Sequence, residues 1–219
     1  MSQKLRYTLI TDGSSDKVLL NIIKWLLDDL YPKLPNKGTF ADFSGLQQKP
    51  KTGDIDERIG YAQKYYPYDL LIYHRDAETT DKNIVQKRKN EVLKNIKNSN
   101  NIGNTVCIVP VVMMESWLLI DEIAIKKAAG NKNYKENIVL PPPKKLETLN
   151  EPKKILHELL KTVSGLKGRN LAKFNVNYSV HLIAENITDF SVLRELNAFR
   201  VFEADLKDAV NLFLSLQNK

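Results

Sequence analysis

The stretch YTLITDG, at residues 7–13, predicts a short buried strand that ends in a tight turn. Ser14 or Ser15 follows and can cap a helix through its hydroxyl group. Apolar residues then recur at helical spacing and form one stripe: Leu19, Ile22, Ile23, Leu26 and Leu30. Pro32 and Pro35 end that helix, because proline cannot continue it. The stretch therefore predicts a strand, a turn and an amphipathic helix, which is the repeating unit of α/β folds.

The same order recurs along residues 39–130. A weaker strand is predicted at 39–43, followed by a helix at 54–65. Continuous apolar runs at 69–73 and 105–112 predict two strands that are covered on both faces. A basic helix to about residue 98 separates these two strands, and a further helix opens at residue 114. Four alternations of strand and helix predict an α/β fold, with a four-stranded parallel, Rossmann-like sheet and flanking helices.

The pattern changes after Gly130. Three prolines at 141–143 form a rigid spacer, and no strand pattern follows them. Helices are predicted at 152–163, 179–186, 190–197 and 203–217. The sequence thus predicts two parts: a metal-binding sheet domain at 1–130 and a helical C-terminal region at 131–219.

Positive charge is clustered along the chain. The net charge is +7, and residues 79–99 hold six Lys/Arg against two Asp/Glu. Residues 141–173 hold eight against three. Each stretch is either a solvated helix face or a surface for a polyanion such as nucleic acid.

Membrane and export signals are missing from the sequence pattern. No apolar run approaches the roughly 18 residues of a membrane span, and the first residues lack the apolar stretch of a signal peptide. Cys107 is the single cysteine and cannot form an internal disulfide. We therefore expect a cytoplasmic protein with no membrane partner.

Carboxylates stand at the ends of three predicted strands. Asp12 follows the first, Asp76 and Glu78 follow the third, and Glu115 follows the fourth. The carboxyl ends of parallel strands meet at one edge of the sheet, where ligands bind. Grouped carboxylates repel one another unless a cation lies between them, and Mg²⁺ takes oxygen ligands. The sequence therefore predicts a divalent-metal site formed by these four residues.

Simpler interpretations stay open for several residues. Asp76 and Glu78 point the same way only if the backbone is extended. Asp16 lies in the first turn of a helix, where it either complements the helix dipole or binds metal. Glu115 is a metal ligand or an exposed first-turn residue, and His74 orients a water or phosphate or packs at the strand end.

Two short motifs resemble those of Toprim domains, which occur in topoisomerases, primases and related nucleases. They are TDGSSD at residues 11–16 and HRDAE at 74–78. VPVVMMESWLLID at 109–121 and LKGRNLA at 166–172 are similar to segments of small bacterial Toprim-like proteins. Those proteins are often paired with an ABC- or SMC-type ATPase in phage-defence settings. The acidic residue of the first motif is usually Glu in Toprim domains, and here it is Asp12. The second motif usually ends in Asp, and here it ends in Glu78.

The resemblance implies a metal-binding catalytic site. Asp12, Asp76 and Glu78 would be the catalytic residues, and Mg²⁺ or Mn²⁺ would bind there. Asp16 and Glu115 would be additional metal ligands. The candidates for phosphate contacts are Arg75, Lys82, Lys87, Arg88, Lys167 and Arg169.

The resemblance also implies a function. We expect a metal-dependent nuclease, a hydrolase of RNA (including tRNA) or DNA, that acts as the effector of an antiviral defence pair with an ATPase partner. The alternative is a degenerate Toprim-like module that binds and regulates an ATPase without catalysis. The sequence leaves the oligomeric state open.

Overall fold

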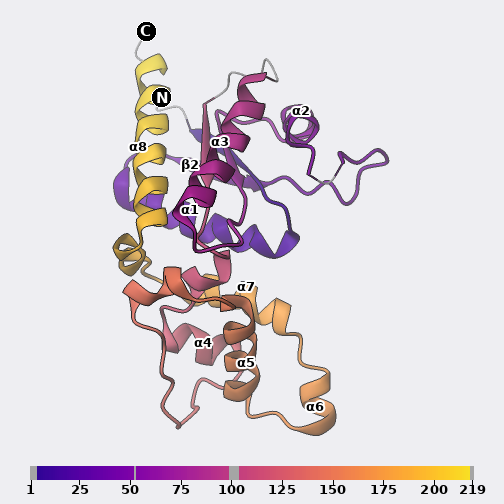
Figure 1. Cartoon of the computed structure of the whole chain (residues 1–219), viewed down its shortest axis with the longest axis vertical. Helices are drawn as coiled ribbons and strands as arrows, with labels where there is room; N and C mark the ends of the chain where they lie inside the picture. Colours follow the sequence, from indigo (N-terminus) through magenta and orange to yellow (C-terminus); the bar gives the residue numbers. More distant parts are fainter. Residues whose placement is uncertain (1–3, 52, 99–103, 218–219) are drawn as a thin grey trace.

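The structure is a computed structural model that describes residues 4–51, 53–98 and 104–217. It contains a four-stranded sheet, which lies in the upper half of the molecule in Figure 1. All neighbouring strands are parallel, in the order β2-β1-β3-β4. The strands are β1 (Leu5–Ile10), β2 (Asn36–Phe40), β3 (Leu70–His74) and β4 (Thr105–Ile108). The predicted α/β class and the four-stranded parallel sheet are therefore confirmed.

The inner strands are buried on both faces. In β3, Leu70 and Ile72 enter the larger apolar core, while Leu71 and Tyr73 enter the smaller core on the opposite face. Successive side chains of a strand point to opposite faces, so a strand between two helical layers needs apolar residues at every position. This requirement explains the unbroken apolar runs of the sequence.

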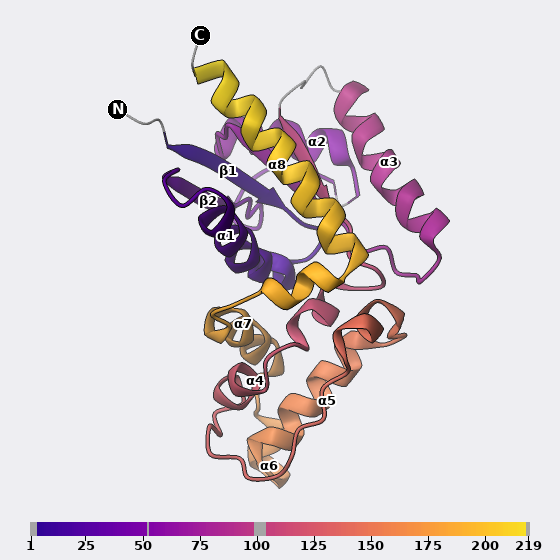
Figure 2. The ribbon, with the colours of Figure 1, turned by 90° about the vertical axis from the view of Figure 1, so that its left-hand side faces the viewer.

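Two helices cover each face of the sheet. The helices α1 (Leu19–Leu30) and α8 (Asn197–Gln217) cover one face, and α2 (Ile55–Tyr65) and α3 (Lys82–Asn98) cover the other. Figure 2 shows α1 and α8 on the side of the sheet that faces the viewer. The C-terminal helix α8 packs on β4, with the side-chain amide of Asn104 donating to the carbonyl of Ala209 at 2.6 Å. The chain thus returns from its helical region to complete the layer that α1 begins.

The remaining helices gather at the carboxyl end of the sheet (Figure 2). These helices are α4 (Glu122–Ala128), α5 (Pro152–Ser164), α6 (Gly168–Ala172) and α7 (Val176–Asn186). Four 3₁₀ segments connect the elements: η1 (Ser14–Val18), η2 (Met114–Leu118), η3 (Pro143–Thr148) and η4 (Ser191–Glu195). Because α7 packs on η1 and α5 on η2, the helical region closes over the edge where β1 and β4 end.

Several element boundaries differ from the sequence prediction. The second strand lies at 36–40 rather than 39–43, and β4 ends at residue 108 rather than 112. The helix expected from residue 114 is interrupted, because Asp121 caps a new helix by accepting from the N–H of Ala124 at 2.9 Å. The last helix begins at residue 197 instead of 203. One continuous apolar core contains residues from both sides of residue 130.

Across the described ranges, no helix combines the length and the apolar character that a membrane span requires.

Candidate active site

The acidic motifs lie at the point where the sheet reverses its strand order. The chain passes from β1 to β2 on one side and then returns to β3 on the other side of β1. Ligands of open parallel sheets bind at such a switch point, outside the carboxyl ends of the strands. Asp12 and Asp16 follow β1, and Asp76 follows β3, so these two strands deliver three carboxylates to this point.

His74, the last residue of β3, lies between two of these carboxylates. Its Nε2 is 3.2 Å from Oδ1 of Asp76, and its Nδ1 is 3.4 Å from Oδ2 of Asp16. The second distance suits an ion pair, although the ring nitrogen is not aligned for a hydrogen bond. The side chain of His74 is only 1% exposed. His74 is therefore part of the acidic cluster and joins the ends of β1 and β3.

The charge on His74 follows from these neighbours. Burial alone lowers the pKa of a histidine, because it disfavours the charged ring. The carboxylates of Asp16 and Asp76 outweigh burial and raise the pKa of His74 to about 9. At neutral pH the ring is an imidazolium ion between two carboxylates, and it neutralises charge there as a bound cation would.

Asp16 is held in place by the turn that follows β1. The backbone N–H of Gly13 donates to Oδ2 of Asp16 at 3.3 Å, and the hydroxyl of Ser15 donates to Oδ1 at 3.1 Å. Burial raises the pKa of Asp16, but the His74 ring and these two donors bring it below its usual value. Gly13 itself has an ordinary extended backbone, and a Cβ at this position would only reach van der Waals contact. The fold alone therefore does not require glycine here.

Glu115 approaches the same cluster from η2. Its side chain is 4% exposed, and Oε1 lies 3.5 Å from Nζ of Lys153 on α5. Burial and the charges of Asp76 and Asp16 raise the pKa of Glu115, although Lys153 opposes this effect. The backbone N–H of the preceding residue, Met114, donates to Oδ1 of Asp76 at 3.0 Å. Thus η2 both adds a carboxyl group and fixes the orientation of Asp76.

Asp12 has a different partner. Its Oδ1 lies 3.1 Å from Nη1 of Arg58, which α2 supplies, and Nη2 of Arg58 donates to the carbonyl of Thr11. The Asp12 side chain is 46% exposed, whereas that of Arg58 is 9% exposed. The Asp12 carboxylate is therefore exposed to solvent at the end of β1, and it is paired with the buried guanidinium of Arg58.

Glu78 departs from the geometry that the sequence suggested. The backbone is not extended at this residue, because φ is +55°, in the left-handed region. Its N–H donates to the carbonyl of Val112 at 2.9 Å, and Val112 also has a positive φ of 63°. The expectation that Asp76 and Glu78 point the same way along an extended chain is therefore wrong at Glu78. The side chain is exposed, and no hydrogen bond or ion pair joins it to another described residue.

The left-handed backbone of Glu78 gives a stability prediction. Non-glycine residues in this region cost roughly 1–2 kcal/mol. We expect Glu78→Gly to unfold at a higher urea concentration than Glu78→Ala, with a free energy of unfolding about 1 kcal/mol larger. Both variants lack the carboxylate, so equal loss of any activity in the two would assign that loss to the carboxylate. Equal stability of the two variants would show that the backbone at this position is not left-handed.

The basic residues suggested for phosphate contact are scattered. Arg75 and Arg88 each place Nη1 3.5 Å from Oε2 of Glu91, so both share one acidic partner. Lys87 is exposed on α3, while the side chain of Lys82 lies outside the described residues. Lys167 and Arg169 belong to the region of α6, at the far end of the helical region from the sheet (Figures 1 and 2). The six residues therefore do not form one surface around the acidic cluster.

The donor atoms at the ends of β1 and β3 are carboxylate oxygens, which are the ligands that a hard divalent cation takes. The described ranges contain no group of three or more His, Cys, Asp or Glu side chains already placed to hold a metal ion. Mg²⁺ keeps several waters and needs only one or two carboxylates. Asp12 and the 26%-exposed Asp76 supply such oxygen donors at the switch point. Asp16 and Glu115 lie deeper in the protein and already have His74 and Lys153 beside them.

The charge state of His74 can be measured directly. We expect its ring to carry both protons at pH 7 in metal-free protein and to titrate near pH 9. The folded-state pKa lies above the unfolded value of 6.5, so this protonation stabilises the fold fully below about pH 6.5. The contribution is lost as the pH rises through about 9. NMR titration of the imidazole nitrogens, assigned with His74→Gln, tests this; a midpoint near 6.5 would contradict the arrangement.

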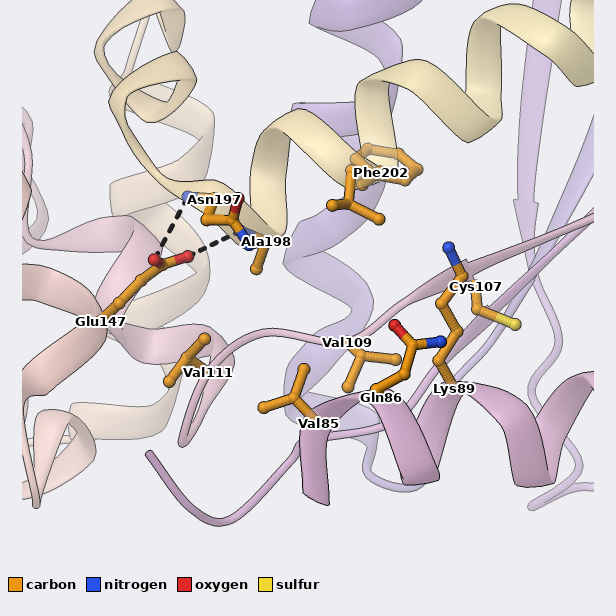
Figure 3. A pocket seen from close by; sticks show the side chains of 11 residues that line it. Val85, Gln86, Lys89, Cys107, Val109, Val111, Glu147, Asn197, Ala198 and Phe202 are labelled. Atoms are coloured by element: carbon orange, nitrogen blue, oxygen red, sulfur yellow. Dashed lines mark hydrogen bonds between the residues drawn. The ribbon is translucent and has the colours of Figure 1, made fainter. Parts of the chain in front are cut away.

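A separate cavity of about 260 Å³ lies between α3, the end of β4 and the start of α8 (Figure 3). Glu147 also borders it, but its carboxylate caps α8 by accepting from the N–H groups of Asn197 and Ala198 at 3.2 and 2.7 Å. The apolar lining residues are Val85, Val109, Val111, Ala198, Val201 and Phe202. None of the acidic residues of the cluster lines this cavity, so it is distinct from the candidate active site.

Three residues of the site were not singled out, or were given a minor role, by sequence reasoning. The sequence leaves two interpretations open for His74, as a residue that orients a water or phosphate or as a packing residue at the strand end. It singles out neither Arg58 nor Lys153. The HRDAE motif placed His74 beside the acids, but only the pairing of β1 with β3 brings it to Asp16.

Comparison with protein-family models, curated proteins and solved structures found no match to this chain.

Proposed function

We propose that this protein is a divalent-metal-dependent hydrolase that cleaves the phosphodiester bonds of nucleic acid. The observation that carries the proposal is the meeting of Asp16 and Asp76 at the ring of His74, at the switch point of a parallel sheet. The buried Glu115 lies near enough to both carboxylates for their charges to raise its pKa. The net charge of +7 favours a polyanionic substrate. The Toprim-like motifs of the sequence agree with this chemistry.

The chain's own residues have separate tasks in this proposal. A metal held by Asp12 and Asp76, with Glu78 on the adjoining loop, would activate water and stabilise charge on the phosphate. His74 and the N–H of Met114 orient Asp76. Arg58 orients Asp12. Glu115 keeps a proton more readily than an ordinary carboxyl group and suits proton transfer within the cluster.

The test is a cleavage assay with purified protein. Mixed tRNA, single-stranded DNA and duplex DNA are incubated with Mg²⁺ or Mn²⁺, and parallel samples contain EDTA. Metal-dependent cleavage of at least one substrate is the expected result. If no substrate is cut by the protein, with or without a candidate ATPase partner, the proposal is wrong.

A second candidate function is a non-catalytic module that binds an ATPase. The position of His74 favours this candidate, because its two ring nitrogens already contact the carboxylates of Asp16 and Asp76. Calorimetric titration with Mn²⁺ separates the two: millimolar or tighter binding that Asp76→Ala abolishes argues against a degenerate site. An ATPase partner and a role in antiviral defence are compatible with either function, and affinity capture with the neighbouring gene products tests them.

A further inference from the structure

A groove extends from the candidate active site along the open edge of the sheet. Its inner part, about 330 Å³, lies at the ends of β1 and β2 and is bordered by Asp12, Gly13 and Arg58. Its outer part, about 800 Å³, lies between η1, β2 and α7. The two parts share Ser14, Phe40 and Asp42, so they form one continuous depression. Figure 2 shows α7 below α1, on the β2 side of the molecule.

Three exposed lysines line this groove. Lys49 borders the inner part, and Lys17 and Lys37 border the outer part. None of the three forms an ion pair with another described residue, although the charges of Lys17 and Lys49 help to keep the pKa of Asp42 below its usual value. The groove also contains acidic groups. Asp12 is already paired with Arg58, which leaves Asp42 and Glu185 as the unpaired acids against three lysines.

Aromatic and imidazole rings accompany these charges. Tyr178 on α7 is 60% exposed although it is a large side chain, and His181 lies one helical turn further along. Phe40 is half-buried where the two parts of the groove meet. Proteins that bind single strands combine a basic groove for the backbone with exposed rings on which bases stack.

We propose that this groove binds single-stranded polynucleotide and leads it to Asp12 at the acidic cluster. The inference rests on the proposed function, since it assigns the path of that substrate. Phosphates lie near Lys17, Lys37 and Lys49, and a base stacks on Tyr178. Duplex binds weakly, because a stiff double helix cannot bend into a depression between η1, β2 and α7. The sugar is not selected by these contacts, so RNA and DNA strands both bind.

Binding is measured by fluorescence anisotropy in EDTA, where no cleavage occurs. The probes are labelled 12-nucleotide oligo-U and oligo-dT and a 12-base-pair duplex. We expect both single strands to bind at least tenfold more tightly than the duplex. A triple alanine variant of Lys17, Lys37 and Lys49 should lower the salt dependence of binding by a slope of about 2. Tyr178→Ala should weaken binding about 5- to 150-fold.

The matched control changes the same charge elsewhere. Lys94, Lys127 and Lys132 are exposed lysines outside the groove, and their triple alanine variant should bind like the unaltered protein. If the two triple variants weaken binding equally, or if duplex and single strand bind equally well, the groove is not the binding site. Single-strand binding in EDTA without cleavage in any metal would support the groove and contradict the nuclease proposal. Cleavage by the unaltered protein, together with unchanged binding by the groove variant, would support the nuclease proposal and contradict the groove.

Discussion

Asp76→Asn is expected to reduce metal-dependent cleavage at least about 100-fold while the protein remains folded. Asp76 is the partly exposed carboxylate that both the N–H of Met114 and the ring of His74 hold in place. Asparagine keeps an oxygen that accepts from both donors, so the local structure has no reason to change. The negative charge is lost, and with it the attraction for a cation.

The control for this variant is Asp189→Asn. Asp189 is exposed, and its carboxylate also accepts from a backbone N–H, that of Ser191 at 2.8 Å. The Asp189→Asn protein should cleave at the same rate as the unaltered protein. A second measurement does not depend on activity: Asp76→Asn removes one of the two carboxylates that raise the pKa of His74, so this pKa should fall. An Asp76→Asn protein that retains most of its cleavage rate would exclude Asp76 from the reaction centre.

The sequence predicts the sheet well, because each strand and helix is specified by the apolar pattern of its own segment. The unbroken apolar run at 70–73 is typical of a strand covered on both faces, and the stripe from Leu19 to Leu30 is typical of a helix that covers one side of a sheet. Boundaries were less accurate where a single contact decides them. Asp121 ends one helical segment and begins another by accepting from the N–H of Ala124, and helical periodicity does not reveal that change.

The acidic cluster was predictable only in part. Strand ends place Asp12 and Asp76 at the same edge of the sheet, because parallel strands finish there. The partner of each carboxylate depends on contacts between distant segments. Arg58 reaches Asp12 from α2, and Lys153 reaches Glu115 from α5. No spacing rule relates residues this far apart, and the left-handed turn at Glu78 likewise depends on its hydrogen bond to Val112.

A fragment of residues 1–130 is expected to fail to fold. It lacks α8, which packs on β4, and it lacks α5 and α7, which close over the ends of the strands. The large buried side chains of α8 are Phe199, Phe202, Leu206, Val210 and Phe213. Burying each such side chain contributes about 1.5–3 kcal/mol, so their combined loss is comparable to the 5–15 kcal/mol stability of a typical domain. Circular dichroism and limited proteolysis of the fragment should therefore show an unfolded or aggregated chain.

The control keeps every residue and cuts only the connection. A protease site introduced in the exposed turn near residue 133 allows the full chain to be folded first and then cleaved. We expect the two pieces to stay together and unfold in one transition, because Trp117 packs edge-on against Phe199 with ring centroids 5.3 Å apart. That contact joins η2, which positions Glu115, to α8. Since the helical region thereby supports the acidic cluster itself, the 1–130 fragment should also lose any metal binding. A soluble 1–130 fragment with a cooperative unfolding transition would show instead that the sheet is an independent domain.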